Sequence, residues 1–192
     1  CSYNDNAVKS EENYLEGTPE TGYEVYGMIK RMLLVGLRAF ETEYGMKYSF
    51  FIPSTLYGEN YDFHDRHFIY DLIKKICLAK HKGQEPVVLW GTGDQRRELI
   101  YVRDAVRVIL NKICQEERMI NLSTGLDYSI KDYARAICDL VDYDFNKITF
   151  DTTKFVGAKE KKIYNDKIKD ESFTDLKDGL RKTVDFYLQT HM

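Results

Sequence analysis

Apolar positions along the chain follow helical spacing in some segments and form short strand-like runs in others, and the two kinds of segment alternate. Between residues 23 and 43 apolar side chains recur every three or four positions, which predicts an amphipathic helix that ends near Gly45. Residues 47–52 form a short apolar run closed by Pro53, which indicates a strand. Further on, the pattern predicts helices over 66–81, 103–116, about 130–141 and 172–188, and extended segments over 86–90, 98–102, 119–122 and 148–150. Strands that alternate with helices in this way predict an α/β chain with a mainly parallel sheet.

Two of these helices carry recognisable start signals. Thr18-Pro19-Glu20 places a proline where the first helical turn accepts one, so the first helix is expected to start there. Ser129 and Asp132 have the spacing of a capping box, in which each side chain accepts a hydrogen bond from the backbone N–H of the other residue.

Composition and charge exclude several classes of protein. The 192 residues are 43% hydrophobic and 31% charged, which is ordinary for a globular protein with one domain or parts of two. A net charge of −3 with dispersed basic residues argues against a nucleic-acid partner, and no apolar run approaches a membrane span. Cys1, Cys77, Cys114 and Cys138 show no CxxC spacing. They predict reduced thiols in a cytoplasmic protein, with no disulfide and no metal site.

The main candidate for chemistry is the pair formed by Tyr26 and Lys30. Four residues apart on a helix, they share one face, so the ammonium group can approach the phenol and favour the phenolate form. A phenol in that setting can give or take a proton near neutral pH. Tyr70 and Lys74 repeat the same spacing, however, and an isolated match is better explained by a core tyrosine beside a solvated lysine.

A second motif begins at Trp90 and continues through Gly91-Thr92-Gly93 to Arg97. The glycines allow a tight turn after a strand, and the arginine beyond them could hold a diphosphate through two N–H groups. Taken alone, the motif is better explained by a β-turn followed by solvated arginines.

In this order and at these spacings, the segments resemble the extended short-chain dehydrogenase/reductases that act on nucleotide sugars, the NAD-dependent epimerase/dehydratase family, and within it the GDP-L-fucose synthase branch. The segments that carry the resemblance are Cys1-Ser2-Tyr3 (the family's Ser-Ser-Cys-x-Tyr), residues 53–60 (its Pro-Thr-Asn-Leu-Tyr-Gly-Pro-Asn), the loop with His64 and His67, Asn121-Leu122-Ser123-Thr124-Gly125, and the last helix. The resemblance implies the C-terminal part of a Rossmann-type doubly wound parallel sheet plus a smaller α/β substrate-binding domain. Residues 1–58 would belong to the first and 59–192 mainly to the second, with about 95–125 returning to the Rossmann sheet.

The resemblance also implies roles for single residues. Tyr26 would donate a proton to the oxygen at C4 of the sugar while hydride arrives from the nicotinamide, and Lys30 would hold the cofactor ribose. Cys1 and His67 match the base and the acid that move protons at the epimerised carbons. Pro53 and His67 match positions at the cofactor. The positions that match substrate-binding residues are Thr55, Lys75, Trp90, Arg97 and Lys161 or Lys162.

Several positions depart from the family pattern. Thr55 replaces an asparagine, Lys75 an arginine, and Tyr70 and Asp71 a proline and a small residue. A pocket altered at these positions suggests a different 4-keto-6-deoxyhexose or a heptose, and reduction without epimerisation is an alternative. Three other residues have structural expectations: Arg96 should face solvent, and Asp104 and Asn121 should be architectural.

The expected function is NADP(H)-dependent reduction, with or without 3,5-epimerisation, of a GDP-4-keto-6-deoxy sugar or heptose, with NAD(H) as the alternative cofactor. A homodimer through the Tyr26 helix is expected. Two alternatives stay open, a UDP-sugar 4-epimerase or decarboxylase of the same superfamily and a non-catalytic nucleotide-sugar-binding fragment. The family's Gly-x-x-Gly-x-x-Gly phosphate loop has no counterpart here, so it is expected upstream of residue 1, and the segment alone is expected to be inactive.

Overall fold

The computed structural model describes residues 2–4, 9–62, 67–113, 115–154 and 162–192, and the chain divides into two compact units. Unit 1 comprises Cys1–Ser54, Ala105–Gly125 and Lys162–Glu171. Unit 2 comprises Thr55–Asp104, Leu126–Lys161 and Ser172–Met192. Because each unit draws on three separate segments, the chain passes between them repeatedly.

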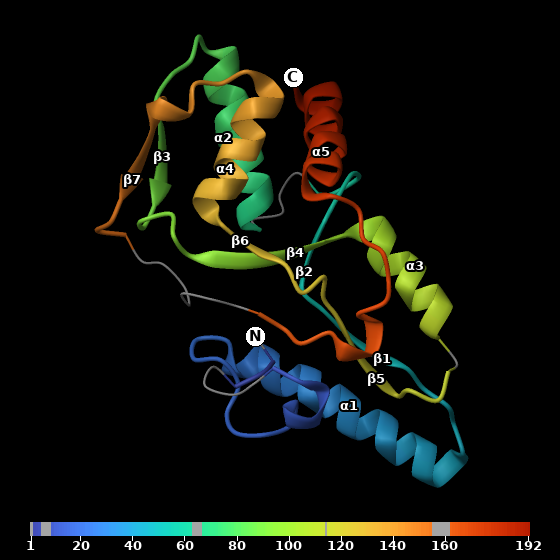
Figure 1. Cartoon of the computed structure of the whole chain (residues 1–192). Coiled ribbons are helices and arrows are strands. Elements are labelled where there is room, and N and C mark those ends of the chain that lie inside the picture. Colours follow the sequence, from blue (N-terminus) through green and yellow to red (C-terminus); the bar gives the residue numbers. More distant parts are fainter. Residues whose placement is uncertain (1, 5–8, 63–66, 114, 155–161) are drawn as a thin grey trace. The chain divides into compact units, whose positions relative to one another are not determined.

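Unit 1 is built on one long helix and a pair of parallel strands. Its elements are η1 (Glu11–Asn13), α1 (Glu24–Tyr44), β1 (Phe50–Pro53), β5 (Met119–Leu122) and η3 (Asp166–Ile168), and α3 (Val102–Lys112) enters it at Ala105 (Figure 1). In the β1–β5 pair, Phe50 lies opposite Met119 and Pro53 opposite Leu122.

The core of unit 1 is small and rich in aromatic rings. Tyr3, Tyr14, Leu34, Ile52 and Met119 are all buried in it. The Tyr14 ring meets those of Tyr3 and Phe50 edge-on, with centroids 5.1 and 5.5 Å away, an arrangement that aromatic pairs favour. The N-terminal segment is therefore part of the packed core of this unit.

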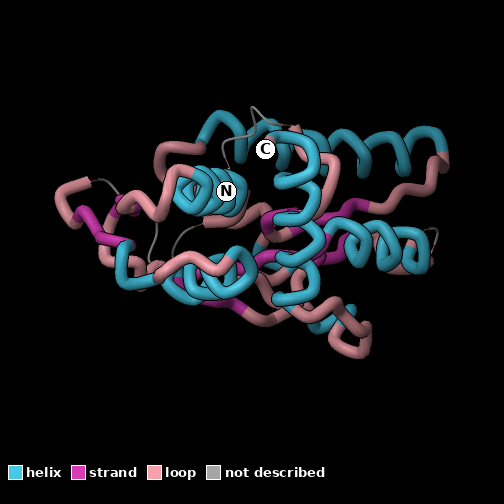
Figure 2. Tube along the Cα trace, turned by 90° about the horizontal axis from the view of Figure 1, so that it is seen from above, coloured by secondary structure: helices cyan, strands magenta, loops and turns pink. Residues whose placement is uncertain are grey.

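Unit 2 contains the other strands and most of the helices. Its elements are β2 (Thr55–Tyr57), α2 (Phe68–His81), β3 (Val87–Trp90), β4 (Arg96–Tyr101), β6 (Asp127–Ser129), α4 (Ile130–Val141), η2 (Phe145–Lys147), β7 (Ile148–Asp151) and α5 (Leu176–His191). β2 and β4 pair in parallel, β6 adds antiparallel to β4, and β3 pairs in parallel with β7. The strands are short stretches between longer helices (Figure 2).

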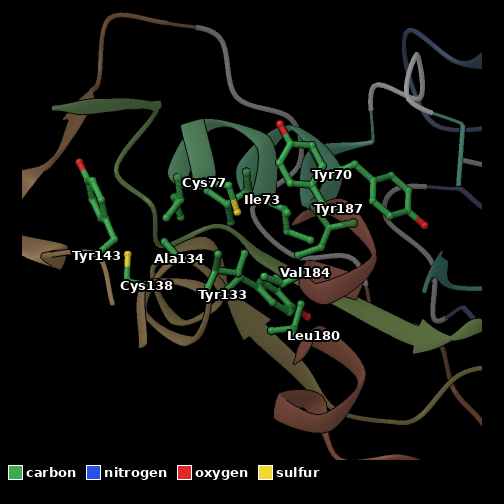
Figure 3. Close-up of a cluster of buried hydrophobic side chains, with 14 of the residues drawn as sticks. Tyr70, Ile73, Cys77, Tyr133, Ala134, Cys138, Tyr143, Leu180, Val184 and Tyr187 are labelled. Atoms are coloured by element: carbon green, nitrogen blue, oxygen red, sulfur yellow. The ribbon is translucent and has the colours of Figure 1, made fainter. Parts of the chain in front are cut away.

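Three helices form the core of unit 2. α2, α4 and α5 pack on one another (Figure 1). The buried side chains between them include Ile73, Tyr133, Leu180 and Val184 (Figure 3). The apolar stripes that the sequence pattern predicted on these helices are thus the surfaces that they bury against each other.

The α/β fold class with mainly parallel strand pairing is confirmed, and the capping box at Ser129 and Asp132 forms as predicted. The start of the first helix was predicted wrongly. Glu20 is buried and its backbone N–H donates to the Tyr3 carbonyl, and Gly22 turns the chain at φ 85°, so α1 begins only at Glu24. The strands β2 and β6 were not predicted.

No helix in the described parts of the chain is long and apolar enough to cross a membrane. Cys77 and Cys138 are free thiols, buried on α2 and α4. Burial raises the pKa of each thiol to about 12, which keeps both protonated at neutral pH. Cys1 and Cys114 lie outside the described residues.

Candidate active site

Tyr26 and Lys30 lie on one face of α1, near its N-terminus. The Lys30 Nζ atom is 5.4 Å from the centroid of the Tyr26 ring, within the range of a cation–π contact. The Tyr26 side chain is about half exposed, at 53%. The helical spacing therefore does bring ammonium and phenol together, with the phenol open to a ligand.

Asn121 is the polar centre of unit 1. It is fully buried near the end of β5, and its Oδ1 atom accepts a hydrogen bond of 2.6 Å from the Tyr3 hydroxyl. Its Nδ2 atom donates to the carbonyls of Lys9 and Tyr164, at 3.0 and 2.9 Å. Its backbone N–H donates to the Glu11 carboxylate at 2.8 Å. These contacts join three separate segments, as expected for an architectural residue.

Lys162 directly precedes the residues that hydrogen-bond to Asn121 and Ser123. The Ser123 hydroxyl donates to the Ile163 carbonyl at 2.8 Å, and Asn165 donates to the Ser123 carbonyl at 3.1 Å. Lys162 itself is exposed. Lys161, the alternative to Lys162 for this role, lies outside the described residues, as do Cys1 and His64.

The glycine turn after β3 is fixed by the start of α4. The backbone N–H of Lys131 donates to the Gly93 carbonyl, and that of Ile130 donates to the Gln95 carbonyl, both at 3.0 Å. Trp90, at the end of β3, leaves 59% of its surface exposed. Trp90 therefore presents an accessible ring at the edge of an ordered turn.

Arg97 lies on β4, and its backbone carbonyl accepts a hydrogen bond from a side chain of α4. The Tyr133 hydroxyl donates to the Arg97 carbonyl at 2.8 Å, and the Arg97 side chain donates to the Arg96 carbonyl at 2.7 Å. Burial keeps the pKa of Tyr133 above its ordinary value, so this hydroxyl stays a donor.

Arg96 does not simply face solvent, contrary to the prediction. Its Nε and one terminal nitrogen reach the two carboxylate oxygens of Asp127, at 3.0 and 3.1 Å, and the guanidinium also donates to the Asp127 carbonyl. The reason is the antiparallel strand β6, which the sequence pattern did not reveal and which places Asp127 beside β4.

Lys75 and Asp71, two departures from the family pattern, pair with each other. The Lys75 Nζ atom is 2.7 Å from the Asp71 carboxylate, one turn apart on α2, and both side chains are partly exposed. A carboxylate this close offsets part of the positive charge that a phosphate group would meet at Lys75.

His67 is the N-cap residue of α2. Its carbonyl accepts hydrogen bonds from the backbone N–H groups of Tyr70 and Asp71, and the residue is exposed. Thr55 begins β2, opposite Leu99 of β4, and Pro53 is the exposed last residue of β1. Asp104 accepts a hydrogen bond from the Thr174 backbone at 2.7 Å, in keeping with an architectural role.

Sequence reasoning missed a cluster around Glu59, the residue that stands where the family pattern has proline. The Tyr101 hydroxyl donates to the Glu59 carboxylate at 2.6 Å, and Arg103 lies 3.2 Å from the other carboxylate oxygen. Burial, and then the Glu59 carboxylate, raise the pKa of Tyr101 to about 12. Burial acts to raise the pKa of Glu59, but its hydrogen bonds and the Arg103 charge lower it overall. The Leu-Tyr-Gly-Glu sequence gave no sign of this pairing, because its partners lie over 40 residues away.

Comparison with protein families identifies the chain. The model of the NAD dependent epimerase/dehydratase family matches residues 1–122. The chain belongs to this family. It is 32% identical over 185 residues to the GDP-L-fucose synthase of Dictyostelium discoideum, in an alignment that covers 91% of the chain and 57% of the relative. It is 31% identical over 182 residues to the GDP-L-colitose synthase of Yersinia pseudotuberculosis, in an alignment that covers 91% of the chain and 58% of that relative.

A solved member of the family shows the same fold. The structure of a GDP-L-fucose synthetase from Naegleria fowleri bound to NADP has 25% sequence identity and a TM-score of 0.87, and the match covers 100% of this chain and 64% of that one. The chain thus spans less than two thirds of the length of these family members.

Proposed function

We propose that the protein containing this chain is an NADPH-dependent enzyme that reduces a GDP-linked 4-keto-6-deoxy sugar or heptose, with or without 3,5-epimerisation. The observation that carries the proposal is the Tyr26 phenol beside the Lys30 ammonium on α1, 5.4 Å from ring centroid to Nζ, in a chain whose relatives are named GDP-L-fucose and GDP-L-colitose synthases. NADPH is favoured over NADH because a solved relative holds NADP.

The residues of α1 fit a nicotinamide cofactor. Lys30 offers an ammonium donor for ribose hydroxyls beside an accessible phenol, and Pro53 offers an exposed apolar surface at the end of β1. When bound, the cofactor would supply hydride to C4 of the sugar. Tyr26 then delivers a proton to the C4 oxygen.

Epimerisation would need two further proton-transfer groups. A carbon acid beside a ketone requires a base on one face and a donor on the other. We assign these roles to Cys1 as base and His67 as acid. The exposure of His67 at the start of α2 supports its access to a ligand.

Most of the residues to which we assign substrate binding lie in unit 2. We propose that Arg97 and Lys162 or Lys161 hold the diphosphate, that Trp90 offers its exposed ring to the nucleotide, and that Thr55 and Lys75 line the substrate site. Unit 1 would then be the remaining part of the cofactor-binding domain, and unit 2 mainly the substrate domain.

We also propose a cytoplasmic homodimer that forms through α1. Apolar side chains that are more than half exposed cover this helix, namely Val25, Met28, Ile29, Met32, Leu33, Val35 and Phe40. A contiguous apolar surface of this kind usually marks an interface. The free, buried thiols of Cys77 and Cys138 agree with a reducing compartment.

The test uses protein made from the complete reading frame that encodes these residues. It is mixed with NADPH and a panel of GDP-4-keto sugars, and cofactor oxidation is followed. Tyr26→Phe and Lys30→Met should each lower kcat about 10²- to 10⁴-fold. Tyr44→Phe, an exposed tyrosine at the end of the same helix, should leave it unchanged.

A second readout separates reduction from epimerisation. If both occur, His67→Asn should abolish solvent deuterium incorporation at C3 and C5 of the sugar. If the unaltered protein oxidises NADPH with none of the sugars, the proposal is wrong. Turnover of UDP-sugars instead would point to a 4-epimerase or decarboxylase.

A further inference from the structure

The strands β3 and β7 form a two-stranded parallel sheet in unit 2, and its two faces have different surroundings (Figure 1). Val87 and Leu89 of β3 and Ile148 of β7 are buried in the core that they share with α2, α4 and α5. Because side chains alternate between the two faces of a strand, Val88 and Trp90 lie on the opposite face, where they are 50% and 59% exposed. That face therefore presents an apolar surface that a ligand can reach.

Asp151 lies beside Trp90 at the carboxyl ends of the two strands. The register pairs Trp90 with Asp151, and the Gly91 N–H donates to the Asp151 carbonyl at 2.8 Å. Residues that pair in register in a parallel sheet project their side chains to the same face, from strands about 4.8 Å apart. An accessible indole ring and a carboxylate are thus neighbours at the edge where open α/β sheets bind their ligands.

The Asp151 carboxylate is oriented by the turn that follows β7. Its Oδ1 atom accepts hydrogen bonds from the Thr153 backbone N–H at 3.0 Å and from the Thr153 hydroxyl at 2.6 Å. The bond from the hydroxyl, and then the bond from the N–H, lower the pKa of Asp151, so the group is ionised at neutral pH. No described residue donates a hydrogen bond to Oδ2. One oxygen of an oriented carboxylate is therefore available to accept hydrogen bonds from a ligand.

Guanine differs from the other bases on the edge that such a carboxylate would meet. Its N1–H and N2–H₂ groups point to the same side of the ring, so one carboxylate oxygen can accept from both. Uracil offers a single N–H between two carbonyl oxygens, which a carboxylate repels, and adenine has an acceptor in place of the N1–H. Every base, in contrast, can stack on an aromatic ring. A carboxylate beside an indole ring would thus supply selectivity and affinity through separate side chains.

We infer that Asp151 selects guanine by accepting hydrogen bonds from its N1–H and N2–H₂ groups, while the Trp90 indole stacks on the base. The inference rests on the proposed function and deepens it, because it names the residue that distinguishes GDP-linked from UDP-linked sugars. Asp151 determines specificity and takes no part in the transfer of hydride or protons.

The test measures the affinity of protein from the complete reading frame for GDP, IDP (inosine diphosphate) and UDP by titration calorimetry. IDP lacks only the N2 amino group of GDP. The unaltered protein should bind GDP about 10-fold more tightly than IDP, because a hydrogen bond to a charged acceptor is lost. It should bind UDP more weakly still.

Three variants assign the selectivity to its residue. Asp151→Asn keeps an acceptor for Thr153 but turns an amide N–H₂ toward the donors of guanine. It should weaken GDP binding about 10- to 100-fold and bring GDP and IDP within about twofold of each other, without weakening UDP binding. Trp90→Leu should weaken the binding of all three nucleotides by a similar factor of about 10 or more. Asp139→Asn, which removes an exposed carboxylate from α4, should match the unaltered protein.

The outcomes separate the guanine site from the proposed function. Equal affinity of the unaltered protein for GDP and IDP, or tighter binding of UDP, would overturn the inference without any variant. An unchanged GDP-to-IDP ratio in Asp151→Asn, or in Asp151→Ser if the first variant does not fold, would overturn the role of Asp151. Unchanged GDP affinity in Trp90→Leu would overturn the stacking. In each of these cases, reduction of a GDP-linked sugar leaves the proposed function standing. Selective binding of GDP with reduction of none of the sugars overturns the proposed function and supports the guanine site.

Discussion

At the scale of single residues, unit 1 depends on polar side chains that join segments far apart in the sequence. Asn121 and the Tyr3 hydroxyl bonded to it are separated by 118 positions. Such buried polar groups are costly to leave without partners.

Replacement of Asn121 by alanine should therefore destabilise the protein. The buried Tyr3 hydroxyl would lose its acceptor, and the carbonyls of Lys9 and Tyr164 would each lose the Asn121 donor, although the Lys9 carbonyl keeps its hydrogen bond from the Tyr164 N–H. We expect a decrease of about 3 kcal/mol in the free energy of unfolding, measured by urea denaturation. Asn111→Ala, at an exposed position on α3, should change it by less than about 0.5 kcal/mol. Similar values for the two variants would contradict the role given to Asn121.

The candidate site was only partly predictable at this scale. Tyr26 and Lys30 could be paired from the sequence because four positions along a helix is a local rule. Arg31 could not be distinguished from a solvated arginine, because its three carbonyl partners lie 14 to 29 positions away. The Asp127 partner of Arg96 was missed for the same reason.

At the scale of elements, helices were predicted more reliably than strands. In each long helix the apolar positions recur several times along the sequence, whereas β2 and β6 have three residues each, too few to establish an alternation. The start of α1 was misplaced because the contact between Glu20 and Tyr3 overrides the local preference of Thr18-Pro19.

The start of α4 gives a test at this scale. The Ser129 hydroxyl accepts a hydrogen bond from the Asp132 N–H at 3.1 Å, and Asp132 accepts one from the Ser129 N–H at 2.9 Å. Ser129→Ala should lower the free energy of unfolding by about 1 kcal/mol, measured by urea denaturation. Thr152→Ala, in an exposed turn, should have little effect.

The capping box should also depend on pH. The hydrogen bond from the Ser129 hydroxyl, as the largest cause, lowers the pKa of Asp132 in the folded protein. A carboxyl with a lowered folded pKa stabilises the fold above its unfolded pKa of about 4, and this contribution is lost as pH falls through the folded pKa. The difference in the free energy of unfolding between the unaltered protein and Asp132→Asn should thus shrink below about pH 4. A constant difference over that range would exclude the carboxylate as its source.

At the scale of the whole molecule, α1 exposes most of its apolar side chains. Among its residues only Gly27, Arg31 and Leu34 are buried, and the apolar side chains around them are exposed. This distribution is the basis of the proposed homodimer.

A charge in the middle of this surface should weaken the dimer. Met32 is 69% exposed on α1, and Leu110 is 67% exposed on α3. In protein from the complete reading frame, Met32→Glu should shift sedimentation toward the monomer at micromolar concentration, because a carboxylate would be buried without a partner. Leu110→Glu should leave the dimer intact. The homodimer would have to be abandoned if the unaltered protein already sediments as a monomer.

The helix α5 has a contact that limits how the length of this region can vary. A Cβ atom at Gly179 would lie 2.1 Å from the Tyr57 hydroxyl oxygen, so α5 passes β2 with no space for even a methyl group. Loss or gain of one residue between Asp175 and this glycine would rotate the next side chain by about 100° onto the phenol. Length changes in this family should therefore accumulate in the loop before α5 or beyond its end, and the first turn of the helix should keep a constant length.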